Sequence, residues 1–248
     1  MRLDITGKVA TLVIDRPPAN ALNRIAQRDL RDFVLEAGEN HDVRAIVVCG
    51  EGGRFSAGAD IHEMKELSTK ALREHAFVMQ AAFTAVANAP VPVCAAIEGY
   101  ALGGGLELAC ACDFRICADD ARLGLPEINL GVIPGGGGTQ HLTRLIGPAR
   151  AKYSVMTGDE IPVKEAEALR LVDAVVPAGT ALSAAHAFVA RFLDKPRDAL
   201  GAAKRAINAG FTGDGLRAET RAFIDLIGTP AQREGMTAFI EKRLPNFN

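Results

Sequence analysis

The segment from residue 99 to residue 138 contains two glycine clusters and two glutamates, and it constrains the fold more than any other part of the chain. Gly103, Gly104 and Gly105 precede an apolar run over residues 106–111, a pattern that predicts a glycine turn opening into a helix. The first N–H groups of a helix have no partner within it, and they favour a negative charge nearby. The segment therefore predicts a helix N-terminus that can hold a developing negative charge.

Glu107 and Glu127 are the two acids of this segment. Glu107 follows Gly104 by three residues, so the first helical turn would present a carboxylate and a backbone donor on one side. A lone glutamate in this position is usually structural. Glu127, however, has its own glycines and lies among apolar residues that would raise its pKa, namely Leu125, Ile128 and Leu130. Two carboxyl groups in different environments suit acid and base roles.

Strand and helix patterns alternate before residue 178, which predicts an α/β architecture. The predicted strands cover residues 9–15, 45–49, 93–97, 114–117 and 172–176, and the predicted helices cover about 22–37, one long stretch of about 65–88, the run after Gly105, and about 148–157. This periodicity fits both a spiral of repeated turns and a doubly wound sheet.

The chain beyond Ala178 is predicted to be almost entirely helical. Asp214 can cap a helix that ends at Gly228, and the run from Thr229 to Gln232 is a capping box with proline at the first helical position. We therefore divide the chain into a core over residues 1–177 and a helical region over residues 178–248.

Three motifs, in this order, resemble those of the crotonase superfamily and look most like enoyl-CoA hydratase. They are RFSAGADIHEM at residues 54–64, AIEGYALGGGLELACACD at 96–113 and LPEINLGVIPGGGGTQHL at 125–142. The resemblance extends over nearly the whole chain. It implies an α/β fold of the crotonase type, in which a spiral of ββα turns carries the acyl-CoA site and the C-terminal helices build a homotrimer, often paired into a dimer of trimers.

The resemblance also implies the roles of particular residues. The N–H groups of Ala57 and Gly104 would form an oxyanion hole, while Glu107 would hold the water and Glu127 would deliver a proton to C2. Coenzyme A contacts are implied for Gly58, Ala59, Asp60 and Gly135, and for Lys242, which would lie near the adenosine phosphates bound to a neighbouring subunit.

One departure from the family pattern concerns a lysine that many hydratases carry after the first strand. Pro18 and Ala19 occupy that region here, and Arg24 is the nearest candidate substitute.

The resemblance implies reversible hydration of trans-2-enoyl-CoA to 3-hydroxyacyl-CoA, as in the β-oxidation of fatty acids, with coenzyme A as part of the substrate and no separate cofactor. An enoyl-CoA isomerase or a specialised acyl-CoA hydratase remains the alternative, although a pair of glutamates favours hydration.

Composition disfavours several other functions. The net charge of −2, with no basic block, argues against nucleic acid as a main partner, including an RNA-binding role. His62 begins HEMKE rather than HExxH, so no metal site is expected, and Ser56 does not lie in a GxSxG motif. The five cysteines predict reduced core thiols, and the absence of a signal-like or membrane-spanning segment predicts a cytoplasmic protein.

Overall fold

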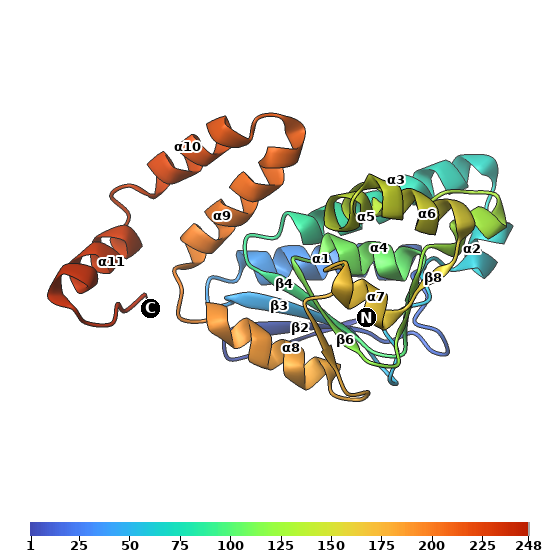
Figure 1. Ribbon diagram of the computed structural model, residues 1–248, viewed down its shortest axis with the longest axis horizontal. Helices are drawn as coiled ribbons and strands as arrows, with labels where there is room; N and C mark the ends of the chain where they lie inside the picture. Colours follow the sequence, from blue (N-terminus) through green and yellow to red (C-terminus); the bar gives the residue numbers. More distant parts are fainter. Residues whose placement is uncertain (248) are drawn as a thin grey trace.

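In the computed structural model, which describes residues 1–247, the main sheet has six strands in the order β1-β2-β3-β4-β6-β9 (Figure 1). They are β1 (Arg2–Thr6), β2 (Val9–Ile14), β3 (Ala45–Gly50), β4 (Val93–Ile97), β6 (Phe114–Ala118) and β9 (Ala174–Val176). The β1–β2 pair is antiparallel and all other pairs in this sheet are parallel.

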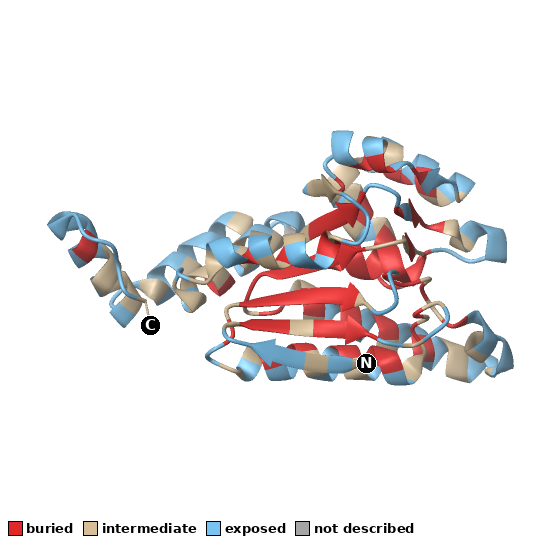
Figure 2. Ribbon diagram, turned by 90° about the horizontal axis from the view of Figure 1, so that it is seen from below, coloured by how far each residue is buried: buried red, intermediate tan, exposed pale blue. Residues whose placement is uncertain are grey.

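The central strands are buried on both faces. β4 is buried along its whole length, and β3 is buried except at Gly50, which explains why both read as continuous apolar runs rather than alternating ones. The edge strand β1 is largely exposed, as Figure 2 shows. The main sheet is therefore a covered α/β sheet with an antiparallel edge.

Helices cover both faces of the main sheet. On one face, α1 (Arg24–Glu39) packs against α3 (Thr69–Ala87) and contributes Leu30 and Val34 to the larger apolar core. On the other face, α8 (Ala181–Val189) contacts β3, β4 and β6. The first turn of α8 is tied to the sheet by Glu98, whose carboxylate accepts the N–H groups of Gly179 and Ala181.

The prediction of one long helix over residues 65–88 is wrong, because two separate helices occupy this part of the chain. α2 (Ile61–Glu66) ends before Leu67, and Ser68 then caps α3 by accepting the N–H of Ala71. Apolar periodicity continues across such a break, whereas the cap depends on local hydrogen bonding that periodicity does not report.

A second sheet of three strands connects the main sheet to the glycine-rich segment. β5 (Tyr100–Leu102) pairs with β7 (Arg122–Gly124), which pairs with β8 (Glu160–Ile161). The sequence analysis did not predict any of these strands, each of which has two or three residues. β5 leads into α4 (Gly104–Ala111), and β7 leads into the 3₁₀ helix η1 (Pro126–Leu130). α5 (Gly138–Ile146), α6 (Pro148–Thr157) and α7 (Val163–Ala168) follow.

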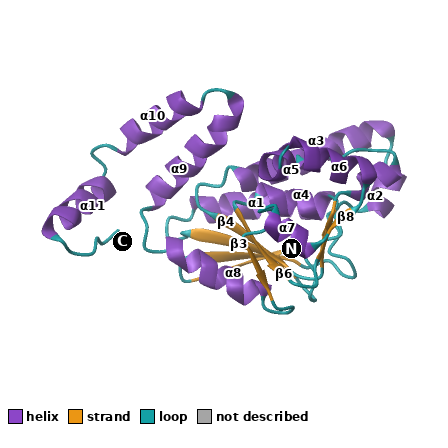
Figure 3. Ribbon diagram, in the orientation of Figure 1, coloured by secondary structure: helices purple, strands orange, loops and turns teal. Residues whose placement is uncertain are grey.

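The last helices extend away from the sheet (Figures 1 and 3). After the 3₁₀ helix η2 (Ala190–Phe192), α9 (Arg197–Ala209) is anchored to the core by Lys204, which forms an ion pair with Asp113 at 2.7 Å. The 3₁₀ helix η3 (Gly210–Thr212), α10 (Gly215–Leu226) and α11 (Pro230–Glu241) then continue to the C-terminus. The predicted Thr229 cap is confirmed, since its side chain accepts the N–H of Gln232.

Two further expectations bear on the chain as a whole. All five cysteines are buried and unpaired, which confirms the prediction of core thiols. Within residues 1–247, no helix combines the length and the apolar composition needed to cross a bilayer. The division of the chain at residue 177 stays a prediction, and the structure adds that α8 packs on the core sheet whereas α9 to α11 project from it.

Candidate active site

The first N–H of α4 is free, as the glycine turn predicted. Gly103 caps this helix with φ 51° and ψ −127°, a conformation open to glycine alone. A Cβ on Gly103 would lie 3.1 Å from Oε1 of Glu127. In residues 1–247, the Gly104 N–H has no hydrogen-bond partner, so it can bind a ligand.

The neighbouring segment over residues 56–60 supplies a second free donor, although not the expected one. The Ala57 N–H donates to the carbonyl oxygen of Ala19 at 3.0 Å, so it is already occupied. Ala59, in contrast, has no partner for its N–H within the described residues. A Cβ on Gly104 would lie 3.3 Å from the Ala59 nitrogen. The structure thus has its second free N–H near Gly104 at Ala59 and not at Ala57.

Glu107 is almost completely buried, at 1% exposure, on the first turn of α4. Its Oε1 accepts the N–H groups of Gly136 at 2.8 Å and Gly138 at 2.7 Å. Burial raises the pKa of Glu107, and the two N–H donors oppose this shift. No described residue donates a hydrogen bond to its Oε2, so one carboxylate oxygen is fixed and the other is available.

Glu127 lies at the start of η1, and its Oε2 is buried without a hydrogen-bond partner in the described chain. Burial raises the pKa of Glu127 to about 7, with a smaller increase from the negative charge of Glu107. The two carboxyl groups therefore interact, and they differ as acid and base roles require: Glu107 accepts two N–H groups, whereas Glu127 titrates near neutrality.

Phe83 and Met79 of α3 lie beside the glycine segment whose N–H groups hold Glu107, and the sequence analysis named neither. The position that a Cβ on Gly136 would take lies 2.6 Å from the Phe83 ring and 3.0 Å from Oε2 of Glu107. Met79 approaches Gly135 in the same way, at 3.7 Å. Their spacing of four residues along α3 was the available signal, because it places both on one face of a helix.

The remaining predicted residues have varied surroundings. Gly58 is buried, and a Cβ there would lie 2.7 Å from the Gly104 nitrogen. The Asp60 side chain forms an ion pair with Arg16 at 2.6 Å and also caps α2, and its backbone N–H and carbonyl are hydrogen-bonded to Leu22 and Met64. Arg24 pairs with Glu63 rather than standing free.

Lys242 is exposed at the C-cap of α11. In Figure 3, α11 lies at the opposite end of the long axis from α2 and α3. Within one chain Lys242 is therefore remote from the two glutamates, and its role at a neighbouring subunit's site stays a prediction.

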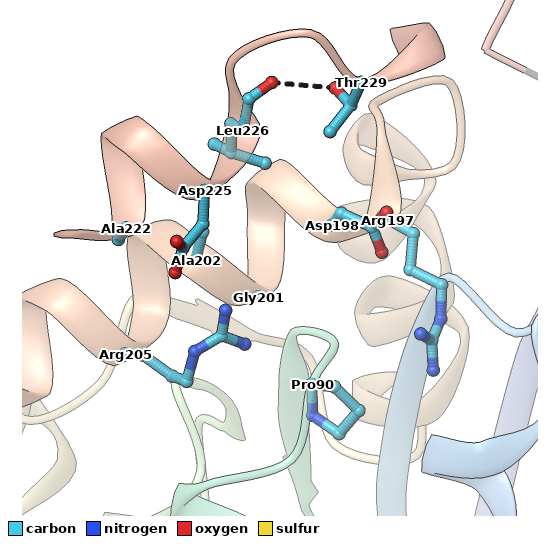
Figure 4. Close-up of a pocket in the computed structure, with 10 residues that line it drawn as sticks. All are labelled: Pro90, Arg197, Asp198, Gly201, Ala202, Arg205, Ala222, Asp225, Leu226 and Thr229. Atoms are coloured by element: carbon cyan, nitrogen blue, oxygen red, sulfur yellow. Dashed lines mark hydrogen bonds between the residues drawn. The ribbon is translucent and has the colours of Figure 1, made fainter. Parts of the chain in front are cut away.

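A separate cavity of about 210 Å³ lies between α9, α10 and Pro90 (Figure 4). Its lining includes Arg197, Asp198, Arg205 and Asp225 and contains none of the predicted site residues. The candidate active site is thus distinct from this cavity.

Comparison with solved structures defines the class of protein. Enoyl-CoA hydratase from Bacillus anthracis matches with a TM-score of 0.93 and 37% identity, over 99% of this chain and 98% of that one. An enoyl-CoA hydratase from Geobacillus kaustophilus matches with a TM-score of 0.92 and 37% identity, over 100% and 97% of the two chains. The fold thus defines an enzyme of the crotonase fold, a class that acts on acyl-CoA substrates.

The chain belongs to the enoyl-CoA hydratase/isomerase family, whose sequence model matches residues 4–248. It is 42% identical to crotonyl-CoA hydratase of Syntrophomonas wolfei, over 99% of this chain and 96% of that protein. It is 39% identical to the short-chain-enoyl-CoA hydratase of Clostridium acetobutylicum, over 97% of this chain and 94% of that protein.

Proposed function

We propose that the protein adds water reversibly across the C2=C3 bond of a trans-2-enoyl-CoA thioester to give the 3-hydroxyacyl-CoA, as in fatty acid β-oxidation. The observation that carries this proposal is the pair of unequal carboxyl groups, Glu107 and Glu127, next to two free N–H groups. Relatives named as hydratases of crotonyl-CoA and short-chain enoyl-CoA support the same reaction.

The oxyanion hole acts on the thioester carbonyl. As water adds at C3, negative charge develops on the thioester oxygen, and the N–H groups of Ala59 and Gly104 bind that oxygen. Donors fixed in position before the reaction stabilise such charge without reorganising. The N-terminus of α4, to which the Gly104 N–H belongs, contributes its partial positive charge.

Glu107 and Glu127 share the proton transfers. Oε2 of Glu107 accepts a proton from the attacking water, while Oε1 remains held by Gly136 and Gly138. Glu127, with a pKa of about 7, delivers a proton to C2. Proton transfer by a positioned side chain contributes about 10²–10⁴-fold to the rate.

The projecting helices support assembly into a homotrimer or a dimer of trimers. They expose large apolar side chains that a lone chain leaves in water: Ile207, Phe211, Leu216, Phe223, Ile224, Ile227, Met236, Phe239, Ile240 and Leu244. Exposed apolar surface of this extent marks a protein interface. In such an assembly Lys242 approaches the adenosine phosphates of coenzyme A bound to a neighbour.

The test is an assay of purified protein with thioesters from crotonyl-CoA to the hexadecenoyl homologue, following the loss of absorbance of the conjugated enoyl thioester. Hydration in heavy water should place deuterium at C2. The alternative, an enoyl-CoA isomerase, predicts preference for a 3-enoyl-CoA and a mild effect of Glu107→Gln. Failure to hydrate any 2-enoyl-CoA would refute the proposal.

A further inference from the structure

A buried polar pair lies between α1 and α3, behind the segment that carries Ala59. Gln27 is 0% exposed and His75 is 2% exposed. The Gln27 amide nitrogen lies 2.9 Å from the carbonyl oxygen of Leu22 and 3.2 Å from Nε2 of His75. Gln27 thus connects His75 on α3 to Leu22, which directly precedes Asn23, the N-cap residue of α1.

Leu22 in turn holds the segment that carries Ala59. Its N–H donates to the Gly58 carbonyl at 2.7 Å, and its carbonyl accepts the Asp60 N–H at 3.4 Å. Ala59 pairs with Leu22 in a parallel bridge, so the Ala59 N–H points away from Leu22 and stays free. The Ala59 nitrogen lies 3.3 Å from the position that a Cβ on Gly104 would take. The Leu22 carbonyl is therefore shared by Gln27 and by residues 58–60, which we call the oxyanion segment.

The hydrogen-bonding roles in this pair follow from Leu22. A carbonyl oxygen only accepts, so the Gln27 atom beside it must be the amide nitrogen. The second hydrogen of that nitrogen faces His75 Nε2, which must then be unprotonated and accept it. The proton of the neutral ring consequently lies on Nδ1, an atom without a partner in the described structure, as is Oε1 of Gln27.

We propose that Gln27 and His75 are positioning residues for the oxyanion segment. This inference rests on the proposed function, because it assigns a catalytic role to the Ala59 N–H. His75 orients the Gln27 amide, Gln27 holds the Leu22 carbonyl, and Leu22 fixes residues 58–60 so that the N–H groups of Ala59 and Gly104 can bind the same oxygen.

Packing alone does not account for the pair. Two buried polar atoms without partners lower the stability of a protein, and apolar side chains of similar volume would fill the space between α1 and α3 without that cost. A role in orienting Leu22 explains why the buried position 27 carries a hydrogen-bond donor.

Protonation of His75 would oppose this arrangement. A hydrogen on Nε2 would face the amide hydrogens of Gln27, donor against donor. The charged groups around the ring are Arg24 from α1, Glu63 from α2 and Asp60 from the segment before α2, and burial is the main cause that lowers the pKa of His75. The ring is thus neutral at neutral pH, as the proposed contact requires.

The main experiment compares Gln27→Met and His75→Leu with the parent enzyme on crotonyl-CoA. Each should lower kcat about tenfold with little change in KM, a smaller loss than the about 10²–10³ expected when an oxyanion donor is removed outright. His75→Gln, which can still accept from Gln27, should recover most of the parent kcat.

The matched control is Thr11→Val. Thr11 contacts His186 at 3.2 Å on the opposite face of the main sheet, so this variant also loses a pairing with histidine but should retain the parent kcat. Equal kcat in Gln27→Met and the parent, or an equal loss in Thr11→Val, would overturn the proposal.

Two readouts do not depend on hydratase activity, and they separate this inference from the proposed function. Amide hydrogen exchange over residues 56–63 should become faster in Gln27→Met and stay unchanged in Thr11→Val. Ring nitrogen shifts of His75 in the parent should show the neutral tautomer with its proton on Nδ1. Unchanged exchange, or a proton on Nε2, would overturn the positioning role even in an active hydratase.

Discussion

Glu107 Oε1 lies 2.7 Å from the backbone nitrogen of Gly138, which begins α5 and follows Glu107 by 31 residues. The first N–H of one helix thus orients a carboxylate on the first turn of another. A Cβ on Gly138 would lie 2.9 Å from both Cγ and Oε1 of Glu107, so only glycine permits this contact.

Gly138→Ala should displace the Glu107 carboxylate and lower kcat by about 10²-fold, since a displacement of about 1 Å can have that effect. Gly210→Ala is the control, because a Cβ there would meet no atom within 4 Å. Steady-state kinetics on crotonyl-CoA with both variants tests this. A fully active Gly138→Ala enzyme would show that the contact does not orient Glu107.

Glu107→Gln and Glu127→Gln should each reduce the hydration rate by about 10²–10⁴. Because both groups handle the same water in the proposed reaction, the double variant should lose far less than the product of the two single effects. Rates with crotonyl-CoA for all four proteins form the test. Additive losses would indicate that the two glutamates act in independent steps.

The stability of the folded protein should depend on pH through Glu127. Burial raises the pKa of this carboxyl group from 4.5 to about 7 in the folded state. The folded protein then binds more protons than the unfolded chain between these values, so this contribution is complete below pH 4.5 and is lost as pH rises through 7. Urea unfolding at several pH values measures it. Glu127→Gln should remove this part of the pH dependence, and an unchanged profile would argue against a raised pKa.

Proline substitutions test the two oxyanion donors. Ala59→Pro and Gly104→Pro delete the proposed N–H groups, and each should lower kcat by about 10²–10³. Gly104 is the first residue of α4, a position that accepts proline. Circular dichroism and coenzyme A binding serve as folding controls. A folded variant with parent turnover would exclude that residue as a donor.

Removal of residues 229–248 should dissociate the oligomer, because it deletes α11 with the exposed Met236, Phe239 and Ile240. Light scattering after size-exclusion chromatography measures the change in mass.

Lys242→Glu should keep the parent mass and raise KM for the acyl-CoA, because the variant reverses only the charge that contacts the phosphates in the proposed complex. An unchanged KM in that variant would remove Lys242 from the binding site.

The sequence by itself was sufficient for the α/β class and the family, and it singled out the two glutamates that the structure brings together. The glycine turn before residue 106 marked the N-terminus of α4, because a glycine cluster followed by an apolar run commonly forms a turn that opens into a helix. The buried strands β3 and β4 were equally clear, since continuous apolar runs flanked by turns report burial directly.

Tertiary structure decided which backbone groups face the site. Ala57 and Ala59 are both small residues of one loop, and only their partners distinguish them: Ala57 donates to Ala19, whereas the pairing of Ala59 with Leu22 turns its N–H away from Leu22 and leaves it free. Likewise, Gly138 meets Glu107, and Phe83 lies against Gly136, through contacts between segments far apart in the chain. A sequence pattern reports local periodicity and turn chemistry, but the direction of a single N–H group depends on neighbours that only the folded chain brings together.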